Sequence, residues 1–166
     1  LGQPQAAPLY FELLGHRRPE VRLRAIEAIV AQKPSGAEAA LQKTLADLDP
    51  KVRSAGALAL GELRATGSVE LLFQSLDRGT FEAAQAIGQA LRSEQLPRLL
   101  GYLGKVPFHQ LAPAFTEIFL RKDISERDKL SGVSRLQDVG TREIKEYFAE
   151  LTRTSGEKLP PPVNRA

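Results

Sequence analysis

Cysteine is absent from this chain of 166 residues, which excludes disulfide bridges, thiolate metal sites and cysteine nucleophiles. Histidine occurs only twice, as His16 and His109, and the two lie far apart in the sequence. A zinc or iron site would need several additional carboxylate ligands, and the acidic residues show no recognisable ligand spacing. We therefore expect no metal site and no cofactor.

Long apolar runs are also missing, since none approaches the ~18 residues of a membrane span. The first residues, LGQPQAAPLY, lack the basic and apolar regions of a secretory signal. Methionine is absent even from position 1, so we expect a segment of a longer protein, or a processed chain, with missing flanking parts. No membrane insertion is predicted. The cytoplasm is the expected compartment, with the periplasm left open.

Charge of neither sign dominates, because 23 basic residues stand against 20 acidic ones and leave a net charge of +3. Such a balance allows nucleic acid to bind but does not require it. With 42% hydrophobic residues, the chain is long enough to bury a substantial core in one compact domain or one short repeat array.

What the chain does have is an internal repeat with an interval of 31 residues. The segments RPEVRLRAIEAIV and DPKVRSAGALALG align so that Pro19 falls on Pro50 and Arg22 on Arg53. A fixed interval of this length indicates a repeat architecture, in which each unit buries its apolar face against its neighbours.

A third copy keeps the interval while its signature changes. Leu76 aligns with Leu45, but Phe81 and Ala84 stand where the proline and the arginine would be. A fourth copy shifts to an interval nearer 27 residues and contains Pro113, which either kinks its second helix or marks a late start for it. In a fifth copy, Ser125 and Thr141 precede carboxylates as plausible helix caps.

Each copy has the pattern of two helices. Apolar residues recur at i, i+3 and i+4 on both sides of the break at Asp49 and Pro50, and no segment alternates with the period of a strand. Asp49 suits an N-cap, and Pro50 suits the first helical position, where its missing N–H costs nothing.

These patterns predict an all-α fold, a right-handed α-solenoid of about five antiparallel helix pairs. We expect one repeat domain over residues 1–154 and a proline-rich, extended tail or linker over residues 155–166. The expected pairs lie at about 5–33, 37–66, 68–93, 95–122 and 125–153.

The segment DPKVRSAGALALG resembles the second helix of a HEAT repeat, with its Asp-Pro-x-Val-Arg start and its later alanines and leucine. The short interval is similar to that of the phycobilisome-lyase-related HEAT subtype. The resemblance is specific over residues 10–93 and only architectural beyond them. It departs at Phe81 to Ala84, where the Val-Arg pair is missing, and at Gly56, where a larger residue would be usual.

The resemblance implies a structural role for Arg22 and Arg53 near the start of each second helix. Both would pair with acidic residues of the turn in their own or a neighbouring repeat, with Asp47 and Asp49 as candidate partners. The planar guanidinium can bind carboxylate oxygens or turn carbonyls while its stem packs on alanine. Recurrence at the repeat interval favours this interpretation over ligand binding, since a catalytic residue is normally present once.

Two surface regions are candidate binding sites. If the apolar positions of each second helix face inward, the outward positions form a neutral, partly apolar ridge with Leu58 as an apolar anchor, which suits a protein partner. A basic cluster at the first repeat could instead contact phosphates. The ridge comprises Arg24, Glu27, Ala55, Leu58, Glu62, Ala86, Gln89 and Ser93, and the basic patch comprises Arg17, Arg18 and Arg24.

Other polar residues favour structural interpretations. His16 aligns with Asp47 and is expected to be an exposed turn residue, and His109 has no Ser, Asp or Glu near it in a known catalytic arrangement. The acidic residues of the segment 123–129 alternate with Arg127 and Lys129, which indicates a solvated helix face.

Aromatic residues in the fourth pair are expected in the core. Phe115, Ile118 and Phe119 recur at helical spacing, as core residues do, rather than as a platform for stacking bases.

We expect a non-catalytic scaffold module that binds a protein partner, or another domain of the same chain, in a larger protein. Richness in alanine, leucine, arginine and proline suggests a bacterial source. The alternative is a nucleic-acid-binding HEAT-like domain that uses the Arg17–Arg24 cluster, although no tryptophan is available to line a base-binding cleft. An enzymatic role would follow only from fold analogy, and the repeated His-Glu pairs of HEAT-like metal hydroxylases do not occur.

Overall fold

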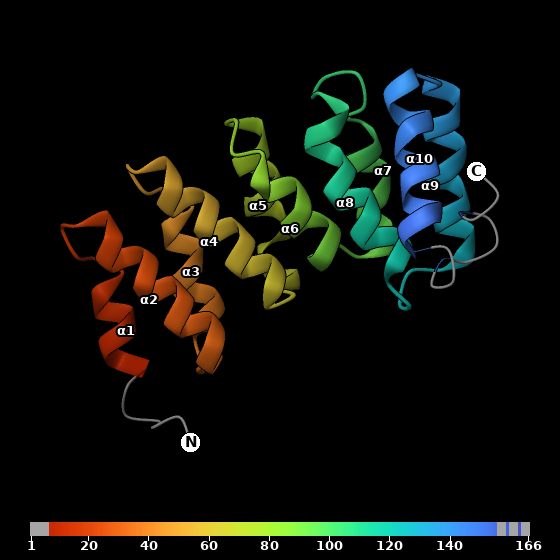
Figure 1. Cartoon of the computed structure of the whole chain (residues 1–166). Helices are drawn as coiled ribbons and strands as arrows, with labels where there is room; N and C mark the ends of the chain where they lie inside the picture. Colours follow the sequence, from red (N-terminus) through yellow and green to blue (C-terminus); the bar gives the residue numbers. More distant parts are fainter. Residues whose placement is uncertain (1–6, 156–158, 160–162, 164–166) are drawn as a thin grey trace. The chain divides into compact units, whose positions relative to one another are not determined.

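The computed structural model describes residues 7–155 together with Leu159 and Val163. The regular elements in these residues are helices, and the extended pairing found there is a single bridge between Leu103 and Val106. The chain divides into two compact units, residues 1–90 and residues 91–166 (Figure 1). Each unit is described separately.

The first unit consists of three antiparallel helix pairs in chain order (Figure 1). Within each pair the two helices pack on one another, and the second helices α2, α4 and α6 make the main contacts between successive pairs. This arrangement confirms the predicted all-α fold of stacked pairs. The helices are α1 (Ala7–Leu13), α2 (Pro19–Gln32), α3 (Ala37–Thr44), α4 (Pro50–Glu62), α5 (Val69–Asp77) and α6 (Glu82–Ala90), with a 3₁₀ turn, η2 (Thr66–Ser68), before α5.

The predicted start of α4 is confirmed in atomic detail. The Asp49 carboxylate accepts hydrogen bonds from the backbone N–H of Lys51 at 2.8 Å and of Val52 at 3.3 Å, and Pro50 is the first helical residue. These bonds satisfy two donors that the first turn of a helix leaves without a partner. Arg18 holds the corresponding position before α2 and provides no side-chain cap.

The ends of the second helices repeat the same backbone shape. Lys33 follows α2 in the left-handed conformation with φ of 46°, and Arg64 does so after α4 with φ of 50°. These residues are 31 positions apart, so the interval seen in the side chains is also present in the backbone. Left-handed φ is unfavourable for residues other than glycine, which makes the recurrence a specific feature of the repeat.

Two glycines of α4 allow close approach of its neighbours. A Cβ atom at Gly56 would lie 1.9 Å from the Thr44 hydroxyl oxygen, and a Cβ atom at Gly61 would lie 2.6 Å from Cα of Ala86. Larger residues at these positions would push α3 and α6 away from α4. The departure from the family pattern at Gly56 therefore has a packing cause, because the buried Thr44 occupies the space.

The second unit contains the 3₁₀ turn η3 (Ser93–Gln95) and the helices α7 (Leu96–Leu100), α8 (Phe108–Leu120), α9 (Glu126–Val139) and α10 (Arg142–Ser155). Helix α8 packs on α9 and α10, and α7 packs on α9. Pro113 lies inside α8, which begins at Phe108, so the proline does not mark a late start of this helix.

The core of this unit is aromatic. Phe115, Ile118 and Phe119 are fully buried, as predicted, and Phe119 lies next to Phe148 of α10 with ring centroids 6.2 Å apart. Stacked and edge-on rings at this separation add to the free energy of burial.

Hydroxyl side chains cap the last two helices, as the sequence indicates. The Ser125 hydroxyl accepts a hydrogen bond from the N–H of Asp128 at 3.1 Å, and the Thr141 hydroxyl accepts one from the N–H of Ile144 at 3.3 Å.

Two side chains from the segment expected to be an extended tail are buried. Leu159 and Val163 are 8% and 0% exposed, so at these positions the segment packs against the protein. The other residues from 156 to 166 lie outside the described residues.

Candidate functional site

Arg22 links the first helix pair to the second. Its Nη1 donates hydrogen bonds to the backbone carbonyls of His16 at 2.8 Å and Arg17 at 3.3 Å, and its Nη2 donates to Oδ1 of Asp47 at 2.6 Å. The side chains of Arg22 and Asp47 are each only 12% exposed, so their ion pair is largely shielded from water. The guanidinium therefore closes its own turn and binds the turn of the next pair.

Arg53 closes the second turn with the same contacts but without the ion pair. Its Nη1 donates to the carbonyls of Asp47 at 2.8 Å and Leu48 at 3.1 Å. These acceptors lie 31 positions after the carbonyls that Arg22 binds. The expected acidic partner Asp49 caps α4 instead, and the residue 31 positions after Asp47 is Arg78, which cannot accept a hydrogen bond.

A second polar network joins the second pair to the start of the third. The buried Ser68 hydroxyl donates to Oε1 of Glu38 at 2.7 Å and accepts from Nε2 of Gln42 at 2.9 Å. The sequence analysis did not identify this network. The one residue type that points to it is the glycine at position 67, because a Cβ atom there would lie only 2.9 Å from Oε1 of Glu38.

The predicted partner-binding ridge is exposed on α2 and α4. Arg24, Glu27 and Glu62 are exposed, Ala55 is half-buried, and Leu58 is 37% exposed, a large share for a leucine. The ridge therefore presents charges of both signs around an apolar side chain.

On α6 the predicted ridge does not continue as expected. Ala86 is fully buried and Gln89 is half-buried, because α6 approaches α4 closely at Gly61. The outward assignment of Ala86 was wrong. The glycine removes the Cβ that would have kept the two helices apart, and this turns Ala86 toward α4.

The basic patch lies at the start of the first repeat. Arg17, Arg18 and Arg24 are all exposed, and within the described part of the chain none of the three forms an ion pair with a carboxylate. His16, expected to be an exposed turn residue, is half-buried, and its Nδ1 accepts from the N–H of Arg18 at 3.1 Å. Its ring thus shapes the turn that carries the patch.

In the second unit, the solvated face expected around residues 123–129 is not fully solvated. Lys129 is buried, and its ammonium donates to the backbone carbonyl of Arg121. Burial lowers the pKa of Lys129 below its usual value, although the carboxylates of Asp123 and Glu126 oppose this shift. The prediction that Lys129 is solvated was wrong, because residue 129 shares the inner face of α9 with Gly132, Val133 and Leu136.

Arg121 is a second buried cation that the sequence pattern did not identify. Its Nη1 donates to the carbonyl of Leu91 at 2.8 Å, and its Nε and Nη2 donate to the two oxygens of Asp123 at 3.0 and 2.5 Å. Like Arg22, Arg121 therefore combines a bond to a main-chain carbonyl with an ion pair to a carboxylate.

His109 gains a partner that the sequence did not indicate. Its Nδ1 lies 3.5 Å from Oε1 of Glu143, and both side chains are at least half exposed. Nearby, burial raises the pKa of Tyr147, whose hydroxyl lies 3.1 Å from that of Thr116. Within the described residues no group of three or more histidines and carboxylates is arranged to hold a metal ion.

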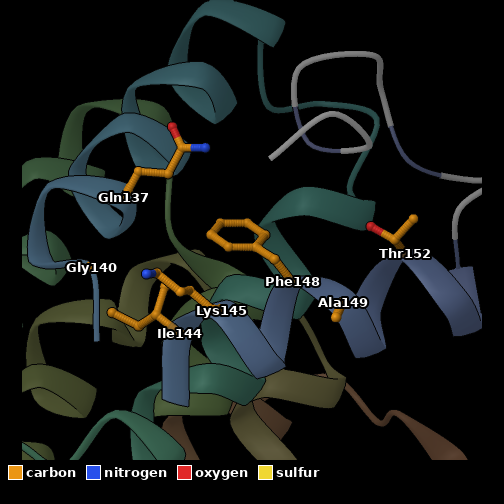
Figure 2. A pocket seen from close by; sticks show the side chains of 7 residues that line it. All are labelled: Gln137, Gly140, Ile144, Lys145, Phe148, Ala149 and Thr152. Atoms are coloured by element: carbon orange, nitrogen blue, oxygen red, sulfur yellow. The ribbon is translucent and has the colours of Figure 1, made fainter. Parts of the chain in front are cut away.

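A hollow with a volume of about 530 Å³ lies between α9 and α10. Figure 2 shows Ile144, Lys145 and Phe148 of α10 beside it, with Gln137 contributed by α9. A smaller hollow of about 340 Å³ lies in the first unit and is bordered by Phe11 and Asp47. The charged side chains of the smaller hollow are Glu12, Lys43 and Asp47, and the Asp47 carboxylate is already bound by Arg22.

No helix in the described part of the chain combines the length and apolar character needed to cross a membrane.

A family model of HEAT repeats matches residues 6–92, just over half of the chain. The protein belongs to the HEAT-repeat family. No curated protein matches the chain. The family assignment agrees with the stacked pairs of the first unit and with the turn-closing arginines at Arg22 and Arg53.

HEAT repeats generally serve as scaffolds that mediate contacts between proteins, and the family is generally not enzymatic. The matched residues end at position 92, so the HEAT-repeat match coincides closely with the first compact unit, residues 1–90. The ridge and the basic patch both lie on these matched HEAT repeats.

Proposed function

We propose that this chain is a non-catalytic protein-binding module of a larger bacterial protein, and that the ridge on α2 and α4 is its contact surface. The observation that carries the proposal is the exposed Leu58, which stands between Ala55 and Glu62 on a helix whose opposite face is buried in the stack. An apolar side chain surrounded by polar ones is typical of the centre of a protein interface.

The charges of the ridge favour protein over nucleic acid as the partner. Glu27 and Glu62 lie on the same surface as Arg24, so a phosphate backbone laid along the two helices would meet carboxylates. The basic patch is limited to the first repeat, where Arg17 and Arg18 are exposed.

A photo-crosslinking amino acid placed at Leu58 in the full-length protein tests the proposal in the native cell. We expect a discrete protein adduct at this position. The matched control places the same group at Leu130, which is 48% exposed on α9 of the second unit and lies outside the ridge. Equal labelling from both positions, or adducts with nucleic acid alone, would contradict the proposal.

A variant that introduces a charge provides a second measurement. Leu58→Glu should leave the melting temperature within about 2 °C, because an exposed position contributes little to stability, and should abolish the adduct formed from a crosslinker at Ala55. A salt-titrated mobility shift with duplex DNA and with single-stranded RNA gives the competing outcome, since binding that weakens steeply with salt would indicate phosphate contacts.

A further inference from the structure

The turns of the second and third helix pairs lack the ion pair that joins the first two. Arg22 has the Asp47 carboxylate at 2.6 Å, whereas the repeat interval places Arg78 at the position that corresponds to Asp47. The interval therefore brings a second cation, rather than an anion, to the turn next to Arg53. Among the described residues, neither Arg53 nor Arg78 forms an ion pair with a carboxylate.

Leu48 lies in the turn that Arg53 closes, and its side chain is 97% exposed. The Leu48 carbonyl accepts from Arg53 at 3.1 Å, and the Asp47 carboxylate accepts from the N–H of Asp49 at 2.9 Å, so the backbone is held on both sides. A solvent-exposed apolar side chain does not stabilise the folded state. A fixed backbone does lower the entropy lost when a partner covers that side chain.

Phe81 supplies a second apolar group in the neighbouring turn. It is 37% exposed and occupies the position that Pro19 and Pro50 hold in the earlier repeats. Figure 1 shows the turn between α3 and α4 and the turn between α5 and α6 at the same edge of the first unit. We call Leu48, Arg53, Arg78 and Phe81 the turn edge.

We propose that the turn edge binds an acidic segment of a partner protein, with a carboxylate between Arg53 and Arg78 and a large apolar side chain against Leu48 and Phe81. This inference rests on the proposed protein-binding function and names the chemistry of the partner. Two guanidinium groups can share a carboxylate through charge-assisted hydrogen bonds, which is the contact that Asp47 provides to Arg22 inside the protein.

Neither Asp49 nor Glu82, acidic residues next to these turns, forms an ion pair with Arg53 or Arg78. Asp49 is engaged as the cap of α4, where it accepts two backbone hydrogen bonds. Glu82, in the first turn of α6, is exposed and would oppose an acidic partner. Glu82→Gln should therefore strengthen binding, by about twofold to threefold for the removal of one exposed like charge.

The decisive variant is Arg78→Asp, which gives the third turn the residue that the second turn has at Asp47. We expect the melting temperature to rise by about 2 °C, because Arg53 gains an internal partner. The probe is a library of random dodecapeptides displayed on phage and selected on the 166-residue chain. Peptides selected on the wild type should carry Asp or Glu beside Leu or Phe and should bind Arg78→Asp at least about tenfold more weakly.

Two further variants separate charge from apolar contact. Arg135→Asp makes the same charge change at an exposed position of α9, and we expect unchanged binding. Leu48→Ser should lower affinity about tenfold with an unchanged melting temperature, because the Leu48 side chain is almost fully in water.

The outcomes distinguish this inference from the proposed function. Selected peptides that bind wild type, Arg78→Asp and Leu48→Ser equally would contradict the proposal that the turn edge is a binding site. Selection of peptides without acidic residues would contradict it as well. If those peptides are instead lost on Leu58→Glu, the protein-binding function stands and the turn edge fails. Failure of the function itself would show as the absence of any protein adduct from Leu58 together with the absence of any selected peptide.

Discussion

The junction between α2 and α4 and the junction between α4 and α6 bring equivalent helices together by different means. At the first, an ion pair of 2.6 Å between Arg22 and Asp47 crosses from one pair to the next. At the second, the backbones approach until a Cβ atom at Gly61 would lie 2.6 Å from Cα of Ala86. A repeated residue thus does not guarantee a repeated contact, because the partner must recur as well.

The two junctions share the contacts within each turn and differ in the contact between helix pairs. Arg22 and Arg53 bind the carbonyls of their own turns at the same positions, so this part of the repeat depends only on nearby backbone. The contact to the next pair depends on residue 47 in one case and residue 78 in the other, and only Asp47 can accept the bond.

The largest effect on stability is expected at Gly61, at the junction between α4 and α6. Gly61→Ala should lower the free energy of unfolding by about 3 kcal/mol, since the new methyl group would overlap Ala86 and α6 would have to move. Chemical denaturation of the variant measures this loss.

The matched control is Gly132→Ala in α9, where the Cβ would lie 3.4 Å from the Phe119 ring, an ordinary contact. There we expect a gain of up to about 1 kcal/mol from the higher helix propensity of alanine. Equal losses at both glycines would show that close packing at Gly61 does not hold the second junction.

The ion pair at the first junction gives the next largest effect. Arg22→Ala should cost about 2 kcal/mol, because it removes the largely shielded ion pair and two hydrogen bonds to carbonyls. Arg53→Ala should cost about 1 kcal/mol, since it removes only hydrogen bonds to carbonyls.

A double-mutant cycle with Asp47→Ala tests the same point. Combined with Arg22→Ala, it should give a coupling free energy of about 1 kcal/mol or more. The corresponding cycle of Arg53→Ala with Arg78→Ala should give a coupling free energy near zero. Equal costs for the two arginines would show that the ion pair with Asp47 does not stabilise the first junction.

Lys129 in the second unit is a buried cation that can lose its proton, so its contribution to stability depends on pH. Because burial lowers its folded pKa below the reference value of 10.5, the unfolded chain binds more protons in the window between these two values. Stability therefore rises with pH across that window. The free energy of unfolding should therefore increase as the pH rises toward 10, relative to Lys129→Met.

Arg22→Ala provides the control for this pH dependence, because it removes an ion pair of the first unit and leaves Lys129 in place. The difference in stability between wild type and Arg22→Ala should therefore not change with pH. Measurements should stop near pH 10, since the raised pKa of Tyr147 makes its own contribution fall at higher pH in both proteins.

The smallest effect concerns the two helix starts. Asp49→Ala should cost about 1 kcal/mol, because two N–H groups of α4 lose their acceptor. Arg18→Asp should gain about 0.5 kcal/mol by giving α2 the cap that it lacks. A loss from Arg18→Asp in thermal unfolding would show that the two turns are less alike than their carbonyl contacts indicate.

Local features of the fold were predictable from the sequence. The cap at Asp49 and the start at Pro50 follow from residue types at fixed short spacings, whereas the turn-closing role of Arg22 and Arg53 was implied by the HEAT resemblance, and the structure has all of these features. Asp47 was one of two candidate partners for Arg22, and the structure shows the bond. Asp49, the other candidate, was already needed as the cap.

Features that depend on how helices approach one another were not predictable in the same way. The burial of Ala86 follows from the missing side chain at Gly61, which is 25 positions away in the sequence. The alternation of charges around Lys129 indicated a solvated face, whereas its spacing of three, four and seven residues from Gly132, Val133 and Leu136 was the better guide. The ridge on α2 and α4 and the turn edge remain predictions.

The carbonyl contacts of Arg22 and Arg53 have a consequence for how this protein can change over evolution. Each guanidinium recognises main-chain oxygens, so these contacts do not depend on the side chains that Arg17 and Leu48 carry in the two loops. Mutations there can alter the outer surface without unfolding the helices behind it. A lineage could therefore exchange one binding specificity for another through loop substitutions while the scaffold is inherited intact.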